Sequence, residues 1–499
     1  MTISIRNIVK QSAKFSVVNI ISLLLKIPNQ IIIGIFLLPE EYGIISFVAL
    51  LKLYAGLINP GMLSAAQREI PYLIGKKEVK QFIRVQNIAI SSDFLYSILP
   101  FLAIFCTSFF YSNKMIKIGL IIAAFSFFTD RFVSYYVAIN FIKQNFTVVA
   151  IGRLIGSILS PIIIIISIYW LGVYAVLIAP LICTLFVGIY YFKKAPIGYS
   201  FKFEWAEIVR LIKIGFVFSL SGLIFYVYRM ADRTIIASFL SLHDLGLFTF
   251  AVTFVMLGIN FLADFGRVFE PILWEHSGKV KNTEDSFNNT KRMAIYMALV
   301  TAMVIPLVQV GYGVTVKLFL PKYVESIPLF LILSNMLYLA SIATIPVVIL
   351  NSVVINKQAF VITVFAIGAG INIIFDLFIV YVGYGIEAIA TFVLYFLARK
   401  YMIKQRNELI LFFRQITLPF IISVLFSVFH GFFFGSTILS LWLLGAISLL
   451  SQIIIWYFMI LLFYRGYLAK DKVISIIKEL YELAFTGIKK KINVLTITR

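Results

Sequence analysis

The chain has 499 residues, of which 61% are hydrophobic and only 13% are charged, and its mean hydropathy is +1.00. A soluble core cannot hide so much apolar surface, and the apolar runs reach the length of a bilayer span. The formal net charge of +21 would suit a nucleic-acid surface in a soluble domain. In a membrane protein it instead reflects basic cytoplasmic loops and attraction to anionic lipid. We therefore predict an all-α polytopic membrane protein that does not bind nucleic acid.

Apolar runs of bilayer length follow one another along the chain. A helix needs about 20 apolar residues to cross the hydrocarbon core, and about 14 runs meet this length. They lie at residues 16–38, 43–66, 85–110, 118–140, 147–169, 172–192, 215–240, 245–268, 293–316, 328–352, 359–383, 386–403, 415–434 and 437–463. We expect each of them to form a transmembrane helix.

The chain contains a long-period internal repeat. Residues 29–48 align without a gap with residues 232–251, with Ile, Phe, Leu and Gly at matching positions and Glu41 opposite Asp244. The same alignment matches Lys26 with Arg229. Secondary transporters use two similar halves of this kind to build a site between two bundles.

The repeat predicts two parallel six-helix bundles around a central cavity, related by a pseudo-two-fold axis along the membrane normal. The N-terminal bundle takes residues 1–192 and the C-terminal bundle residues 215–403. Residues 193–214 form a basic linker, and the stretch FEWAEIVRLIKIGF at 203–216 is expected to form a short amphipathic helix at the inner surface. Residues 415–463 form an additional two-helix hairpin, and residues 464–499 form a basic cytoplasmic tail.

The distribution of Lys and Arg predicts the orientation. If the N-terminus lies inside, most of the 43 basic residues fall on the cytoplasmic side, as the positive-inside rule requires. The exceptions outside the membrane are Lys114, Lys117, Lys317 and Lys322. We therefore expect a multi-pass protein of the plasma (inner) membrane with both termini in the cytoplasm.

Motifs of common catalytic sites are missing from the sequence. It has no Walker A motif, nucleophile elbow or HExxH motif, and Cys106 and Cys183 lie singly within predicted helices. The predicted external loops are short, which leaves no room for an extracellular catalytic domain. We predict no enzyme, no metal and no cofactor. A membrane-embedded carboxylate chemistry, a membrane-bound polymerase or ligase, and a non-transporting scaffold remain alternatives.

Charged side chains within the predicted spans indicate where a functional site lies. Each one costs roughly 2.5–3.5 kcal/mol at the bilayer centre, so it needs a partner or a water-filled cavity. Arg131 and Glu387 also lie within predicted spans, and we assign neither of them to substrate binding or ion coupling. The cations expected to bind substrate in the cavity are Lys26, Lys52, Arg153, Arg229, Arg233 and Arg267. The carboxylates expected to couple transport to an ion are Asp93, Asp130, Asp232, Asp264 and Asp376.

Basic residues near mid-membrane suit an anionic ligand. If both halves direct these helix faces to their interface, Lys26, Arg229 and Arg233 would hold a group such as a diphosphate. Arg binds phosphate in a bidentate manner, whereas Lys acts as a point charge. Two structural readings stay open: Asp232 could neutralise one Arg within its own helix, and the charges could be buried ion pairs that merely join helices.

Four segments carry a resemblance to a known family. They are PEEYGIISF at 39–47, DRTIIASF at 232–239, LGLFTFA at 245–251 and GYGIEAIAT at 383–391. In order and spacing the chain resembles the polysaccharide transporter, or O-antigen flippase, branch of the multidrug/oligosaccharidyl-lipid/polysaccharide (MOP) exporter superfamily. This superfamily also contains multidrug exporters and lipid II flippases. The resemblance covers nearly the whole chain.

The resemblance implies a V-shaped pair of bundles around a basic, water-filled cavity, in which Lys26, Lys52 and Arg229 occupy places suited to a diphosphate. It also implies a flippase that moves an undecaprenyl-diphosphate-linked oligosaccharide from the inner to the outer leaflet by alternating access. Such a unit serves O-antigen, capsule or another surface polysaccharide. The implied partners are the lipid-linked oligosaccharide, membrane lipids and the polysaccharide polymerase machinery.

An ion-coupled multidrug exporter of the same superfamily is the main alternative. Acidic residues in the cavity would then bind cationic drugs, and Asp93, Asp130 and Asp376 are the candidates. Fold alone does not separate these two functions, because function depends on the site.

Overall fold

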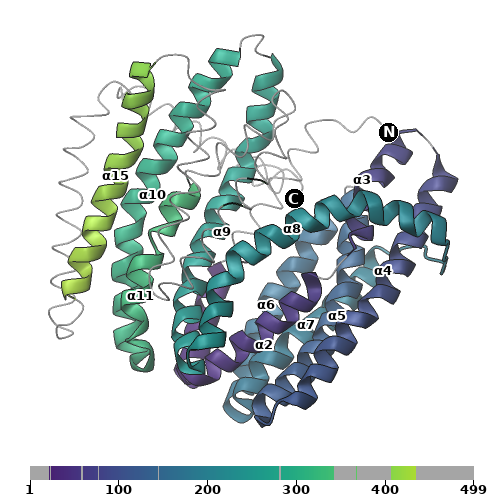
Figure 1. Ribbon diagram of the computed structural model, residues 1–499, viewed down its shortest axis with the longest axis horizontal. Coiled ribbons are helices and arrows are strands. Elements are labelled where there is room, and N and C mark those ends of the chain that lie inside the picture. The colour runs from purple at the N-terminus through teal and green to yellow at the C-terminus, as the bar shows by residue number, and fades with distance from the viewer. Residues whose placement is uncertain are drawn as a thin grey trace, which may run out of the picture.

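The computed structural model of the protein describes residue 22 and residues 24–57, 60–76, 78–143, 145–279, 283–341, 363, 367 and 406–433. Every regular element in these residues is a helix (Figure 1). The predicted all-α fold class is therefore confirmed.

The helices of the N-terminal half begin with a short apolar helix, Leu24–Phe36. It is followed by α2 (Pro39–Leu57), α3 (Met62–Gly75), α4 (Val79–Thr107), α5 (Lys114–Ile142), α6 (Phe146–Leu171) and α7 (Val173–Lys194). The later helices are α8 (Trp205–Phe239), α9 (Leu242–Lys279), α10 (Thr283–Phe319), α11 (Ser326–Leu333) and α15 (Arg406–Phe433). Two 3₁₀ turns, Ser108–Phe110 and Pro321–Tyr323, follow α4 and α10.

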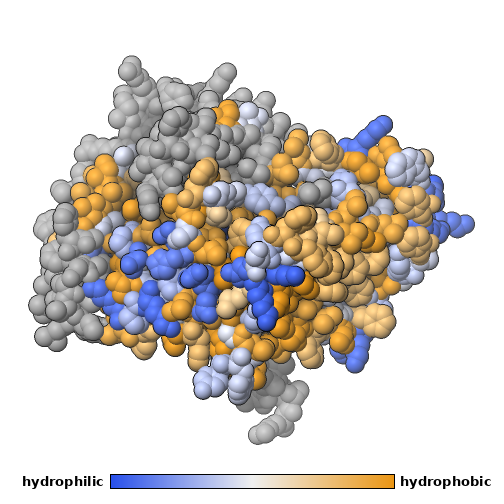
Figure 2. Space-filling model, turned by 60° about the horizontal axis from the view of Figure 1, so that its bottom comes forward, coloured by the Kyte–Doolittle hydropathy of each residue, from blue (hydrophilic) through white to orange (hydrophobic). Residues whose placement is uncertain are grey.

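Several of these helices can cross a membrane. Within the described residues, 5 helices are long and apolar enough, or 6 if α2 and α3 count as one span bent by 59°. Their outward surfaces carry many large apolar side chains, and broad hydrophobic areas cover the face in Figure 2. The protein is thus a multi-pass membrane protein. The predicted spans at 386–403 and 437–463 and the tail at 464–499 lie outside the described residues, as does the span at 359–383 apart from Thr363 and Ile367.

The predicted span at 43–66 is divided in the structure. α2 ends at Leu57, and α3 starts after Gly61, whose φ is 80°. A left-handed backbone favours glycine, and a Cβ on Gly61 would lie 2.3 Å from the carbonyl oxygen of Gly215 in α8. Pro60 and Gly61 form a turn signal that the hydropathy-based prediction overlooked.

The linker also differs from its prediction. The expected short amphipathic helix is not separate, because α8 starts at Trp205 and continues unbroken to Phe239. Residues 195–204 form an irregular segment that runs along α4. The Asn87 side chain donates to the Ser200 hydroxyl at 2.8 Å, and the backbone N–H of Lys202 donates to the Ser91 hydroxyl at 3.0 Å.

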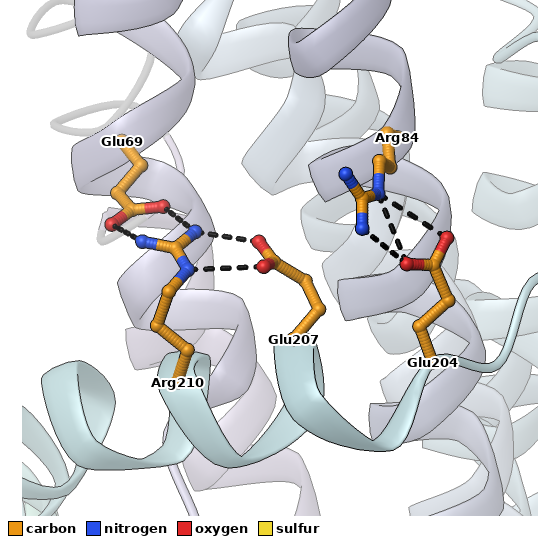
Figure 3. Close-up of polar contacts among 5 residues, drawn as sticks. All are labelled: Glu69, Arg84, Glu204, Glu207 and Arg210. Atoms are coloured by element: carbon orange, nitrogen blue, oxygen red, sulfur yellow. Dashed lines mark hydrogen bonds and ion pairs between the residues drawn. The ribbon is translucent and has the colours of Figure 1, made fainter.

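Ion pairs fix the start of α8 to the N-terminal half (Figure 3). The Arg210 guanidinium donates to both carboxylate oxygens of Glu69 in α3 at 2.6 Å, and also to Glu207 at 2.6 and 3.1 Å. Arg84 of α4 pairs with Glu204 beside them. We call these five residues the linker clamp. Because bidentate Arg–carboxylate pairs restrict orientation, the clamp holds the start of α8 against α3 and α4.

Removing the central cation of the linker clamp is expected to destabilise it. Arg210→Gln leaves Glu69 and Glu207 facing each other, so we expect a loss of about 1 kcal/mol and faster proteolysis of the linker. Lys213→Gln removes the same charge from the same helix and is the control. Thermal unfolding and limited proteolysis at pH 7 provide the measurements, and equal behaviour of the two variants would contradict the role of the clamp.

The pH dependence of the linker clamp follows from Glu207. Hydrogen bonds from Arg210 hold the pKa of this carboxyl below its ordinary value of 4.5. A depressed pKa in the folded state gives stability that is complete above the ordinary value and is lost as the pH falls through the folded one. We therefore expect the stability difference between the wild type and Arg210→Gln to be constant near neutrality and to shrink below about pH 4.5.

The two halves meet where α2 crosses α9, near the bottom of Figure 1, and their helices diverge from there. A Cβ on Gly43 would lie 1.8 Å from the carbonyl oxygen of Leu242, and a Cβ on Gly246 would lie 1.8 Å from that of Pro39. The internal repeat matches Gly43 with Gly246 and Pro39 with Leu242. The crossing is therefore two-fold symmetric, and only glycine fits at its centre.

The same symmetry appears in the first turns of both helices. The Glu41 carboxylate accepts a hydrogen bond from the backbone N–H of Leu38 at 2.8 Å, and the Asp244 carboxylate accepts one from Ser241 at 3.2 Å. These residues occupy matching positions of the repeat. The repeat seen in the sequence is thus present in the local structure of α2 and α9.

Aromatic side chains pack together beside the crossing of α2 and α9. The Phe250 ring lies 4.2 Å from that of Tyr323 and 5.5 Å from that of Tyr42, measured between centroids. The Tyr323 hydroxyl donates to the carbonyl oxygen of Leu37 at 3.3 Å. One hydrophobic cluster therefore continues from α2, α5, α6 and α7 into α9, α10 and α11.

A side chain at the crossing should push the halves apart. Gly43→Ala places a methyl group against the Leu242 backbone, which cannot move as a flexible side chain would. We expect a longer distance between spin labels at the exposed positions Lys114 and Glu325, one in each half. Gly311→Ala is the control, because a Cβ there meets nothing within 4 Å. An unchanged distance in a folded Gly43→Ala protein would show that the crossing does not hold the halves together.

Candidate functional site

An ion pair joins α2 to α5. The Lys52 ammonium lies 2.6 Å from the Oδ2 atom of Asp130 and donates to the Ser126 hydroxyl at 2.7 Å. The Thr184 hydroxyl, on α7, donates to the other carboxylate oxygen of Asp130 at 2.8 Å. We call these four residues the Lys52 site.

The helices place these side chains together for simple reasons. α2, α5 and α7 pack against one another, and residues four apart share a helix face, which puts Ser126 and Asp130 side by side on α5. The side chains of Lys52 and Asp130 are 24% and 45% exposed. The pair is therefore satisfied within the bundle and is only partly buried.

A second charged group adjoins the Lys52 site. Asp93 on α4 is only 1% exposed, and neither of its carboxylate oxygens has a well-formed hydrogen bond within the described part of the chain. Arg131 and Tyr135 of α5 lie close enough to act on its charge. The consecutive residues Asp130 and Arg131 thus interact with different helices. Asp130 pairs with Lys52 of α2, and Arg131 acts electrostatically on Asp93 of α4.

Polar groups also meet between the two halves. The Tyr42 hydroxyl donates to the Gln30 side chain at 3.0 Å and lies 3.4 Å from the Thr253 hydroxyl on α9. Arg233 of α8 acts electrostatically on Tyr42, so this predicted cation lies near the interface between the halves. A further hydrogen bond joins the hydroxyl groups of Tyr54 and Thr234.

The other predicted site residues occupy separate places. Lys26 is exposed on the helix Leu24–Phe36, and Asp232 is half-buried on α8. Arg153 is exposed on α6, with its guanidinium 6.0 Å from the centroid of the Phe141 ring. The structure therefore brings Lys52 together with Asp130, while Arg153 lies near Phe141 of α5.

Part of the predicted site lies outside the described residues. The helices around Arg229, Asp264 and Arg267 are described, but their side chains are not, and the segment containing Asp376 and Glu387 is not described. The meeting of Lys26, Lys52 and Arg229 around one ligand, and the central cavity itself, therefore stay predictions.

The sequence analysis missed the hydroxyl groups of the Lys52 site. Ser126 precedes Asp130 by one helical turn, so the i, i+4 spacing is a signal that could have revealed it. Thr184 gives no such signal, because it lies on another helix, and its hydroxyl is also 2.6 Å from the carbonyl oxygen of Pro180.

The ion pair should be visible in a double-mutant cycle. Lys52→Gln leaves Asp130 without its cation in a partly buried position, so we expect a loss of about 1 kcal/mol. Asp130→Asn in the same chain should restore part of that loss, because it removes the unpaired charge. Thermal unfolding of the two single variants and the double variant measures the coupling. Strictly additive effects would contradict a direct interaction.

The fold is that of a helical membrane protein whose two halves cross at matching glycines. The sequence profile of a family described as "Polysaccharide biosynthesis protein" matches residues 32–313, more than half of the chain. The chain belongs to this family, which confirms the resemblance to a polysaccharide family. No curated protein sequence matches the chain.

Solved structures show the same fold. The lipid II flippase MurJ in an inward closed conformation is 16% identical, covers 90% of this chain and 99% of its own, and has a TM-score of 0.64. An outward-facing multidrug resistance MATE family transporter of the MOP superfamily is 14% identical, with coverages of 79% and 96% and a TM-score of 0.55. The Vibrio cholerae MATE transporter VcmN is 15% identical, with coverages of 80% and 98% and a TM-score of 0.54. At these identities the likeness shows the fold alone.

Proposed function

We propose that the protein is a flippase that moves an undecaprenyl-diphosphate-linked oligosaccharide from the inner to the outer leaflet of the plasma membrane by alternating access. The unit belongs to O-antigen, capsule or another surface polysaccharide. The family description and the MurJ-like fold support a lipid-linked substrate. The observation that carries the proposal furthest is Lys52, an intramembrane cation that stays 24% exposed although it is paired.

The proposed mechanism uses basic residues from both halves. The diphosphate enters from the cytoplasmic leaflet and rests among Lys26, Lys52 and Arg229, with Arg233, Arg153 and Arg267 as further cations along the path. The prenyl chain stays in lipid. Opposite charges gathered in a low-dielectric region attract more strongly than in water, so a few cations suffice to hold the dianionic group while the halves move.

The orientation in the membrane is part of this proposal. With both termini cytoplasmic, the crossing of α2 and α9 lies on the outer side. The contact of Gly43 with Leu242 then closes the outer side, and the halves diverge toward the cytoplasm. This arrangement supports a state that receives substrate from inside.

Transport needs a driving force, and the sequence has no Walker A motif through which ATP hydrolysis would supply it. An ion gradient, the membrane potential or removal of the product by an external polymerase would supply it. Asp93, Asp130, Asp232, Asp264 and Asp376 are the proposed coupling residues, since a desolvated carboxylate binds a proton or cation more readily than one in water.

Depletion of the protein in its host tests the proposal directly. Lipid extraction with face-selective labelling should reveal a diphosphate-linked oligosaccharide that accumulates in the cytoplasmic leaflet. Such accumulation would also identify the sugar. An unchanged lipid-linked pool, in cells that lack redundant transporters, would contradict a flippase.

The predicted cations should be jointly necessary. Neutralising Lys26, Lys52 and Arg229 together to Gln removes the groups that hold the diphosphate, so we expect flipping to fall at least tenfold, about 1.4 kcal/mol in binding. A chain with Lys193, Lys194 and Lys213 changed to Gln loses the same charge at exposed positions and is the control. Intact flipping by the first variant at normal abundance would refute this role of the three cations.

A multidrug exporter is the second candidate, because Asp130 is the more exposed member of its ion pair and a carboxylate can bind a cationic drug. The MATE-like fold fits this function equally well. Drug sensitivity of a deletion strain separates the two candidates: raised sensitivity with a normal lipid-linked pool favours the exporter.

A further inference from the structure

The Lys52 ammonium already has two partners. A lysine ammonium has three donors, and the Asp130 carboxylate and the Ser126 hydroxyl occupy two of them, at 2.6 and 2.7 Å. A diphosphate that binds Lys52 must therefore share the ammonium with a carboxylate or displace it. The carboxylate and the diphosphate carry like charges, so sharing is unfavourable.

We propose that Asp130 competes with the substrate's diphosphate for Lys52 and so weakens its binding and speeds its release. This inference rests on the proposed function, since it requires an anionic substrate at Lys52. Asp130 acts through Lys52 and is a positioning residue, without being a ligand of the substrate.

The surroundings of Asp130 suit a competitor that stays in place. The Thr184 hydroxyl lies 2.8 Å from Oδ1 and 2.6 Å from the Pro180 carbonyl oxygen, and it donates its single proton to one of them at a time, while Lys52 holds Oδ2. When the proton points to Oδ1, this second hydrogen bond keeps the carboxylate on α5 oriented toward α2 as Lys52 turns to the substrate. After release, Lys52 finds its partner again without a large rearrangement.

Such a competitor solves a physical problem of anion transport within a membrane. An unpaired cation in a partly buried site is costly, so an empty site with a bare ammonium would bind the diphosphate tightly and release it slowly. The ion pair lowers the free energy of the empty state. The ion pair therefore reduces the affinity of the site for the diphosphate. It also lets the empty protein return to its inward-open state with Lys52 and Asp130 neutralising each other.

Equilibrium binding of undecaprenyl diphosphate to the full chain in nanodiscs tests the inference, with the neutral alcohol undecaprenol as the reference ligand. We expect Asp130→Asn to tighten diphosphate binding by about three- to tenfold and to lower both KM and kcat of flipping, because release slows. Asp130→Ser removes the charge with a smaller side chain and should do the same. Glu40→Gln, at the exposed start of α2, removes an equal charge and should change neither quantity.

A variant cycle separates competition at Lys52 from a general effect of charge. In the Lys52→Gln background, Asp130→Asn should no longer tighten binding, because the group under competition is gone. Equal tightening in both backgrounds would overturn the inference, as would unchanged or weaker binding by both folded Asp130 variants.

The test also distinguishes failure of the inference from failure of the proposed function. If the wild type binds undecaprenyl diphosphate no more tightly than undecaprenol, the proposed flippase function is wrong and the inference falls with it. If the wild type prefers the diphosphate but the Asp130 variants do not gain affinity, only the competition is refuted.

Discussion

The close crossing of α2 and α9 determines the position of the two halves of this protein relative to each other. Helix backbones approach this closely only where a side chain is missing, and Gly43 and Gly246 supply that gap on both sides. Aromatic rings around Phe250 then fill the space beside the crossing. Because the helices diverge away from this point, the crossing also determines at which end of the molecule the two halves are in contact.

Charge pairing within the N-terminal half is compatible with both a structural and a functional role. In a low-dielectric bundle every cation needs a partner, and α5 provides the means by placing Asp130 beside Lys52 and Arg131 beside Asp93. Lys52 is partly exposed, whereas both members of a purely structural ion pair would be fully buried between the helices that they join. The same side chain therefore joins α2 to α5 and is only partly buried.

Much of the architecture could be predicted from the sequence, because hydropathy and an ungapped repeat are local or periodic signals. The helical class and the repeat follow from them, and Lys52 and Asp130 stand out as charges within apolar runs. The pairing of Lys52 with Asp130 could not be predicted, since the two residues are 78 positions apart and on different helices. The break at Gly61 was missed for another reason: average hydropathy hides a turn that the residue types themselves signal.

The contacts at the crossing also bear on the origin of the chain. Each half packs its glycine against a backbone carbonyl group of the other half. The same surface patch therefore occurs on both sides of the contact. An interface of this kind is isologous, the type found in homodimers with two-fold symmetry. A half-length ancestor would need only a single such surface to dimerise. Joining two copies in one chain then frees each copy to acquire its own charges, as the neutral Asn29 and the charged Asp232 at matching positions illustrate.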